Sequence, residues 1–163
     1  MTDLAGVTSA TADAFPEFYV AAYPVVMGYA FQLTRDPEAA KDVAQEAFTR
    51  LLARWVTVRD PKAYVFHVVT NLVRDTWKAR QRRERLVELL GRTADDTVPA
   101  PDGDLADAVR RLPRGHAVVV LLFYYSDLPL TEVAAAVRRP EGTVKRMLAE
   151  ARQRLAITLE DPR

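Results

Sequence analysis

The sequence predicts an all-α protein built from two small helical modules, and two observations support this. Long segments carry apolar residues at the three- and four-residue spacing of amphipathic helices, and no stretch reads convincingly as a strand. Between these segments, residues 91–104 (GRTADDTVPAPDGD) are rich in Pro, Gly, Asp and Thr and have almost no large apolar side chain. We therefore predict an N-terminal module over residues 13–90, a flexible acidic linker over 91–104 and a C-terminal module over 105–159.

The N-terminal module is expected to contain a bent helix or two shorter ones, followed by two long helices. Asp13 is a candidate cap for the first, and Pro24 should bend or interrupt it, so that one helix or two remains open. The sequence Asp36-Pro37-Glu38 has the cap, proline and early acid that begin a helix. Asp60-Pro61 repeats this signal for a long helix that becomes basic after Asn71.

The C-terminal module is expected to end in a helix-turn-helix. The apolar run over residues 117–122, with Phe123, Tyr124 and Tyr125, predicts a buried helix before it. Residues 130–155 (LTEVAAAVRRPEGTVKRMLAEARQRL) then read as a short helix capped by Thr131, a turn over residues 138–142 and a longer basic helix. The apolar residues of the longer helix recur at core spacing, namely Val144, Met147, Leu148, Ala151 and Leu155.

The charges are segregated along the chain, which the net charge of +1 conceals. One cluster of cations follows Asn71 and a second lies in the last helix, while the segment between them is acidic. The last helix and the turn before it offer cationic and hydroxyl groups that suit phosphates and major-groove base edges, namely Thr143, Lys145, Arg146, Arg152 and Arg154 on the helix and Arg138 and Arg139 in the turn. The simpler alternative is that these charges only solvate an outer helix face.

Composition narrows the class of protein further. The 163 residues include no cysteine, so the chain has no disulfide, thiolate zinc site or thiol switch of its own. No apolar run approaches the roughly 18 to 20 residues that span a bilayer, and the first residues do not resemble a signal peptide, so we expect a cytoplasmic protein without membrane insertion. His67 and His116 stand alone, and no carboxylates are paired in a catalytic pattern; we predict neither an enzyme nor a metal or cofactor site.

Four segments, in order, resemble an ECF-type RNA polymerase sigma factor of the sigma-70 family. Residues 36–52 (DPEAAKDVAQEAFTRLL) are similar to the family's region 2 helix, and residues 61–83 to the promoter-reading helix that follows it. Leu112-Pro113 and the helix-turn-helix over residues 130–155 resemble region 4. The resemblance covers both modules, and it implies a protein that recruits the polymerase core enzyme and directs promoter recognition and transcription initiation.

The resemblance also implies three sets of contact residues. The core-binding set would meet the coiled coil of the polymerase's largest subunit, the minus-10 set unpaired DNA, and the minus-35 set duplex DNA. These sets are Asp42, Gln45 and Glu46 for the core enzyme; Asn71, Arg74, Trp77, Lys78 and Arg80 for the minus-10 element; and Arg138, Arg139, Thr143, Lys145 and Arg146 for the minus-35 element.

Several alternatives stay open at the level of sequence. Trp77 and Tyr64 suit core packing as well as base contacts, and Arg59 lies in a short loop where relatives hold a flipped base. The whole chain could instead be a helix-turn-helix regulator that binds operators directly, or a helical protein that binds an acidic partner. An anti-sigma factor is a further partner that the resemblance suggests.

Overall fold

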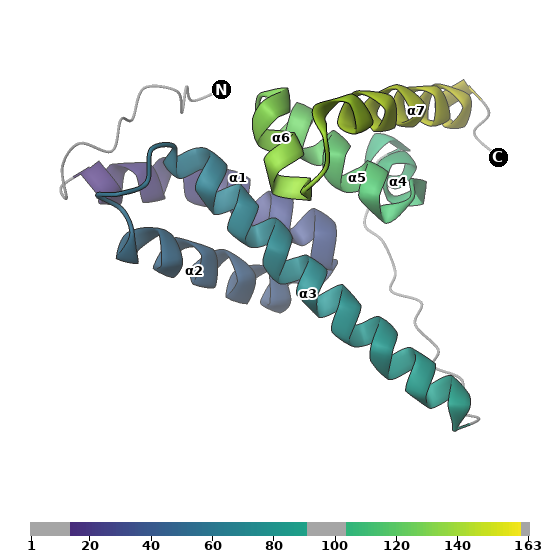
Figure 1. The fold of residues 1–163 in the computed structure, drawn as a ribbon, viewed down its shortest axis with the longest axis horizontal. Coiled ribbons are helices and arrows are strands. Elements are labelled where there is room, and N and C mark those ends of the chain that lie inside the picture. The colour runs from purple at the N-terminus through teal and green to yellow at the C-terminus, as the bar shows by residue number, and fades with distance from the viewer. Residues whose placement is uncertain (1–13, 91–103, 161–163) are drawn as a thin grey trace.

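The computed structural model describes residues 14–90 and 104–160, and within these ranges the regular structure is entirely helical (Figure 1). This confirms the predicted all-α fold. The predicted linker lies outside the described residues, apart from Asp104, which begins a helix. In chain order the elements are α1 (Phe15–Thr34), α2 (Pro37–Ala53), α3 (Pro61–Leu89), α4 (Asp104–Arg111), α5 (Arg114–Val120), the π-helix η3 (Leu121–Tyr125), α6 (Leu130–Val137) and α7 (Glu141–Glu160).

Helices α1, α2 and α3 pack against one another as the first module (Figure 1). An aromatic cluster closes one end of this bundle, where the ring of Phe18 lies 5.4 Å from that of Trp55 and 6.4 Å from that of Phe48. Further along, the buried hydroxyl groups of Tyr29 and Thr70 form a 2.8 Å hydrogen bond between α1 and α3. Burial of these large side chains gives the module an apolar core, which is part of one cluster of buried residues that extends into the second module.

The helix starts predicted for α2 and α3 are confirmed in atomic detail. The carboxylate of Asp36 accepts hydrogen bonds from the backbone N–H groups of Glu38, at 2.9 Å, and Ala39, at 3.4 Å. Asp60 accepts one from Ala63 at 2.9 Å. These bonds satisfy N–H groups that have no partner within the helix. Asp13, the expected cap of α1, lies outside the described residues.

Pro24 does not divide the first helix, which decides the alternative that the sequence left open. Helix α1 runs without interruption from Phe15 to Thr34 with Pro24 inside it. Proline removes one backbone donor and crowds the preceding turn, so packing has to compensate for that cost. Both flanking turns supply buried side chains, among them Phe18 and Ala22 before Pro24 and Val26 and Tyr29 after it. Burial on both sides of the proline explains how the helix continues through it.

The second module consists of α4 to α7 around a smaller apolar core. The prediction of a buried helix over residues 117–125 is correct only in its first part. Val118 to Leu122 are buried, but Phe123 is only partly buried, and Tyr124 and Tyr125 are 51% and 44% exposed. The backbone widens into a π-helix at Leu121, which changes the angle between successive side chains, and both tyrosine rings lie outside the core of the second module.

The helix-turn-helix is present, with two corrections to its expected details. Thr131 does not cap α6, because the helix already begins at Leu130 and its N-cap is Pro129. The turn is also shorter than predicted: α7 begins at Glu141, which places Gly142 inside its first turn. Arg138 ends α6 in the left-handed conformation, with φ of 54°, a position that usually favours glycine.

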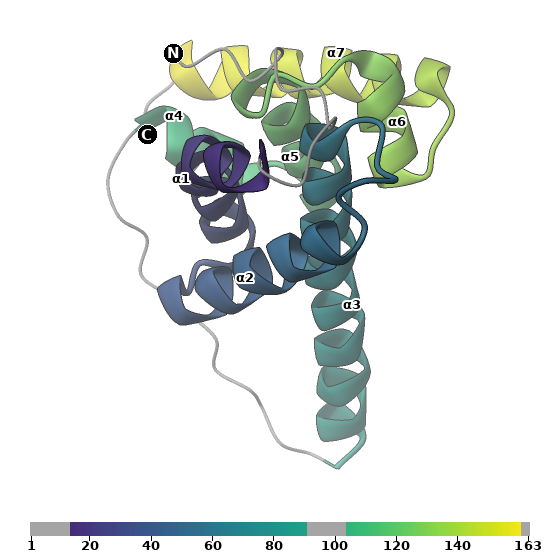
Figure 2. The same cartoon turned by 90° about the vertical axis from the view of Figure 1, so that its left-hand side faces the viewer.

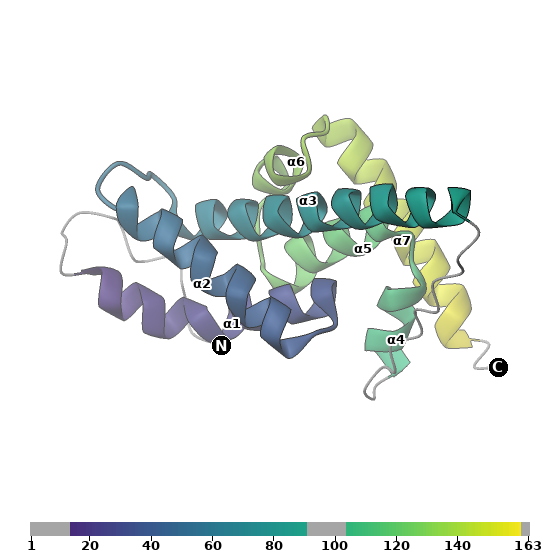
Figure 3. The same cartoon turned by 90° about the horizontal axis from the view of Figure 1, so that it is seen from below.

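The two modules meet where α6 lies across the first half of α3 (Figures 2 and 3). The C-terminal half of α3 extends beyond this contact and away from both modules (Figure 1). Leu86, Leu89 and Leu90 near its end are all more than half exposed. The hydrogen bonds to α6 and to the loop before it run along the first half of α3, from Lys62 to Arg74, and reach the start of the predicted minus-10 surface.

Candidate nucleic-acid interface

One face of α3 gathers three of the predicted minus-10 residues. Asn71, Arg74 and Lys78 follow one another at intervals of three and four residues, which places them on the same side of a helix. Val69 and Val73 point into the core of the first module and fix the orientation of this side. Because of this helical spacing, the three polar side chains all point away from the core of the first module.

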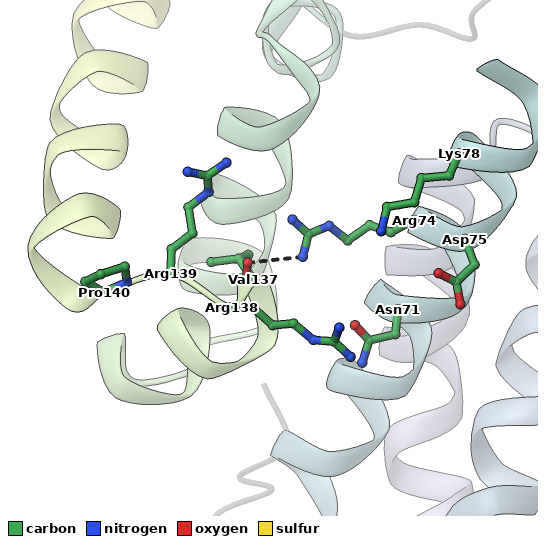
Figure 4. Close-up of a pocket in the computed structure, with 8 residues that line it drawn as sticks. All are labelled: Asn71, Arg74, Asp75, Lys78, Val137, Arg138, Arg139 and Pro140. Atoms are coloured by element: carbon green, nitrogen blue, oxygen red, sulfur yellow. Dashed lines mark hydrogen bonds between the residues drawn. The ribbon is translucent and has the colours of Figure 1, made fainter. Parts of the chain in front are cut away.

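The turn between α6 and α7 lies directly opposite this face (Figure 4). The Nη1 atom of Arg74 donates a 3.1 Å hydrogen bond to the backbone carbonyl of Val137, the last residue of α6. Arg138 extends from the turn toward Asn71. Residues predicted for the minus-10 and minus-35 elements are therefore brought together, a proximity that the sequence did not suggest.

A pocket of about 300 Å³ separates the two surfaces. Its lining combines four cationic side chains with a single carboxylate, that of Asp75. Arg74 and Lys78 come from α3, and Arg138 and Arg139 come from the turn (Figure 4). The excess of positive charge favours a polyanion, and guanidinium groups can bind phosphate through two parallel hydrogen bonds. Asn71, Val137 and Pro140 complete the lining.

The remaining two minus-10 candidates lie outside this pocket. Trp77 is half-buried, and the guanidinium of Arg114 lies over its ring, 5.2 Å from the centroid. Arg80 is paired with Glu84 one turn further along α3, at 2.9 Å. For Trp77, the packing alternative describes the arrangement in this structure, because α5 contributes a cation to the ring face that a base would need.

Helix α7 presents the other predicted base-reading groups. Val144, Leu148 and Ala151 are buried against the module, so the opposite side of the helix faces outward. Lys145 and Arg146 are exposed on it, and Thr143 is half-buried. Further along, the side chain of Arg152 lies over the ring of Tyr124, 5.6 Å from its centroid. Arg152 also donates a hydrogen bond to the hydroxyl of Tyr124, so it has a packing role within the second module.

The predicted core-binding residues lie on α2. Asp42, Gln45 and Glu46 are all exposed, and their spacing places them on one side of the helix. Glu46 forms an ion pair with Arg50 at 2.7 Å, whereas Asp42 lies one turn nearer the start of the helix. The exposed acidic and amide groups suit a basic partner surface.

Residues that join the modules were not identified from the sequence. The Nε2 atom of His67 lies 3.0 Å from the carbonyl of Glu132 and 3.4 Å from its carboxylate, and Lys62 donates to the carbonyl of Asp127 at 3.4 Å. A lone histidine and a lysine at a helix start carry no pattern that reveals a distant partner. Only the docking of α6 on α3 makes these contacts visible.

The second histidine also has a carboxylate partner. His116 lies 2.9 Å from the carboxylate of Glu150, and this hydrogen bond lowers the pKa of Glu150. Across residues 14–90 and 104–160, no group of three or more His, Asp or Glu side chains has the arrangement of a metal site. Within the same ranges, none of the helices combines the length and apolar character needed to cross a membrane.

An all-α chain with a helix-turn-helix and a second basic helix face has the features of a sequence-reading DNA-binding protein. Comparison with known families is more specific. Residues 18–83 match the model of sigma-70 region 2, and residues 102–155 match that of sigma-70 region 4. The chain belongs to the sigma-70 family, as an ECF-type RNA polymerase sigma factor, and its function is therefore promoter recognition and transcription initiation.

Similar proteins support this membership over nearly the full chain. The RNA polymerase sigma-E factor of Streptomyces coelicolor is 31% identical over 147 residues, covering 86% of this chain and 83% of that protein. The ECF RNA polymerase sigma factor SigL of Mycobacterium tuberculosis is 29% identical and covers 99% and 97%.

The fold is shared with a solved sigma factor. The structure of the sigma factor RpoE, in complex with the anti-sigma factor NepR from Bartonella quintana, has a TM-score of 0.72 at 20% identity and covers 93% of this chain and 99% of that one. At this identity the likeness concerns the fold alone.

Proposed function

We propose that the three surfaces divide the work of a sigma factor. In this proposal α2 binds the polymerase core enzyme through Asp42, Gln45 and Glu46. The basic side of α3 holds the minus-10 element, and α7 reads the minus-35 element. The observation that carries the proposal is the segregation of charge: acidic and amide groups are exposed on α2, whereas cations are gathered on α3 and around the helix-turn-helix.

For the minus-10 element, we assign the phosphate contacts to cations on α3. Arg74 and Lys78 share one side of the helix with Asn71, and Arg80 follows them. A cationic track with amide or aromatic groups suits single-stranded DNA. Trp77 belongs to this set only if its ring is released from Arg114, because the cation occupies one face of the indole.

For the minus-35 element, we assign base contacts to Thr143, Lys145 and Arg146, which lie in the first turns of α7. Residues at the start of a recognition helix are the ones that reach base edges in the major groove. Arg138 and Arg139, in the preceding turn, are assigned to phosphates. Phosphate contacts would fix the position of the helix, and α7 would supply the sequence preference.

We propose module boundaries at residues 13–90 and 105–159, and a cytoplasmic, non-catalytic role. The matches to the two family models, over residues 18–83 and 102–155, support a division of this kind. An anti-sigma factor is a proposed third partner, beside promoter DNA and the core enzyme. The solved structure of CnrH, similar at a TM-score of 0.65 and 19% identity, was determined in complex with the cytosolic domain of CnrY.

Run-off transcription tests the proposed function. Core RNA polymerase and a pool of promoter fragments are incubated with and without the full chain, and the transcripts are sequenced. Sequence-selective transcripts that require the chain are expected. A folded protein that binds duplex DNA specifically, yet neither binds core enzyme nor starts transcripts, would instead be an operator-binding regulator.

A matched pair of variants links the assay to the surfaces. Arg146→Ala removes a proposed minus-35 contact, and Gln153→Ala changes an exposed residue further along the same helix. The first variant should lose transcripts from promoters that depend on the minus-35 element, while the second should retain them. Equal effects would contradict the assignment of the base-reading turn.

A further inference from the structure

The pocket between α3 and the turn of the helix-turn-helix is lined by groups from both modules (Figure 4). Two of its cations, Arg74 and Lys78, belong to the minus-10 surface, and two, Arg138 and Arg139, to the turn that precedes the recognition helix. We propose that this pocket is a binding site for a compact phosphate-rich anion, such as an oligophosphate or the triphosphate group of a nucleotide, and that the bound anion holds the two modules together.

The electrostatics of the pocket support an anionic ligand. In the part of the chain that the structure describes, the side chains of Lys78, Arg138 and Arg139 form no ion pair or hydrogen bond, although all three are close to other cations. Arg74 uses one N–H group for the carbonyl of Val137 and retains other donors. Like charges gathered around one space repel one another, and a multivalent anion would relieve this repulsion.

The shape of the pocket favours a small ligand. Its volume of about 300 Å³ lies at the lower end of the range for ligand sites, and its lining is mainly polar. Arg138 holds a left-handed backbone conformation that a non-glycine residue adopts only at a cost. Backbone strain of this kind is often found where a side chain has to be aimed at a ligand.

Binding at this pocket would be linked to the arrangement of the modules. A ligand that contacts both modules binds better when they are together, so it raises the population of the closed arrangement. The same cations are proposed to bind promoter phosphates, and the anion should therefore oppose DNA binding. This last consequence rests on the proposed function, whereas binding of the anion and closure of the modules do not.

Calorimetric titration of the full chain with inorganic tripolyphosphate, at constant ionic strength, tests the site. We expect saturable binding of one anion per chain. Arg138→Gly and Lys78→Gln should each weaken it by about tenfold, the effect of losing one charged hydrogen bond. Arg138→Gly is suitable because glycine favours the left-handed conformation and preserves the turn.

A control variant separates the pocket from general basicity. Arg85→Gln removes an exposed cation of α3 that does not line the pocket, and it should leave the affinity unchanged. Equal weakening by all three variants, or a titration without saturation, overturns the site. Titrations with ATP and adenosine identify the source of the anion. If ATP binds more tightly than tripolyphosphate, the ligand is a nucleotide, and if the two bind equally, the pocket recognises the phosphate chain alone. Tight binding of adenosine would contradict recognition of phosphate.

Distance measurements test the closure. The chain has no cysteine, so Val20→Cys on α1 and Gln153→Cys on α7 provide two exposed positions for spin labels. Tripolyphosphate should increase the population with the short distance between labels, and Arg138→Gly should abolish that increase. An unchanged distance distribution at saturating anion overturns the linkage. Because neither DNA nor polymerase is present, failure here is distinct from failure of the proposed promoter recognition.

Discussion

The hydroxyl group of Tyr125 lies against Gly28, in the space that a side chain at position 28 would occupy. A Cβ atom added at Gly28 would also come within 3.2 Å of Cζ of the tyrosine. Gly28 belongs to α1 and Tyr125 to η3, so this contact joins the two modules through residues that are not assigned to DNA binding.

We expect Gly28→Gln to separate the modules without weakening the first one. Glutamine favours a helix more than glycine does, by up to about 1 kcal/mol, while its side chain would collide with Tyr125. Spin labels on the two modules should show that the population of molecules with a long distance between the labels rises by about tenfold. The double variant Gly28→Gln/Tyr125→Ala removes the obstructing ring and should restore the short distance. If the modules of the double variant remain separated, the collision with Tyr125 is not the cause of the separation.

The buried phenol of Tyr29 makes stability depend on alkaline pH. Burial raises the pKa of Tyr29 far above its usual value near 10, because the ionised phenol would lose its hydration. Above about pH 10 the unfolded chain loses this proton while the folded chain keeps it, so the free energy of unfolding falls as pH rises. At neutral pH the contribution is fully present.

In the Tyr29→Phe variant, the free energy of unfolding should therefore fall less steeply with pH above about pH 10. At neutral pH the variant should lose about 1 kcal/mol, because the hydroxyl of Thr70 keeps its 2.7 Å bond to the carbonyl of Phe66. Urea unfolding at a series of pH values measures both effects. Parallel stability curves for the variant and the native chain would contradict the assigned role of the phenol.

The cap of α2 provides a test of helix stability. Asp36→Ala removes the acceptor for two backbone N–H groups and should cost about 1 kcal/mol in the free energy of unfolding. Asp36→Ser keeps an oxygen at the same position and should cost much less. Chemical denaturation of the three proteins measures the difference, and equal losses in the two variants would show that capping is not responsible.

Charge reversal tests the proposed polymerase surface. Asp42→Lys places a cation where a basic partner surface is expected, and it should weaken core-enzyme binding by about tenfold or more through like-charge repulsion. Glu17→Lys on α1 is the matched control, since Glu17 is also exposed but is not assigned to the core enzyme. Fluorescence polarisation with labelled chain measures the affinity. Unchanged affinity for Asp42→Lys would remove the residue from the core-binding set.

Substitution of the two cations at the start of α7 should change the sequence preference of DNA binding, whereas substitution of a cation that contacts only phosphate should change the overall affinity. Arg146→Ala and Lys145→Ala are expected to relax sequence preference in the minus-35 element, at about 1 to 3 kcal/mol for a lost base contact. Arg139→Ala should instead weaken binding to all duplexes by the same factor. It should also lower the number of ions released on DNA binding, measured from the salt dependence of the affinity, by about one. Binding to a panel of single-substituted duplexes at several salt concentrations separates the two patterns.

Local features of the fold were predictable because short segments carry them. Asp36 and Asp60 accept the bonds that their positions before Pro37 and Pro61 predicted, and the apolar spacing of α7 correctly identified Val144, Leu148 and Ala151 as core. Thr131 and the exposed Tyr124 were predicted incorrectly. Their positions depend on where α6 begins and on the π-helix, which packing rather than local preference decides.

Short sequence patterns were enough to predict a helical chain of two modules that resembles a sigma factor, because periodicity, caps and motifs are properties of neighbouring residues. The tertiary structure decided that Arg74 meets Val137, that His67 meets Glu132 and that four cations surround one pocket. These pairs are separated by more than 60 positions in the chain. Their proximity follows from the docking of one folded surface on another, which no short sequence pattern encodes.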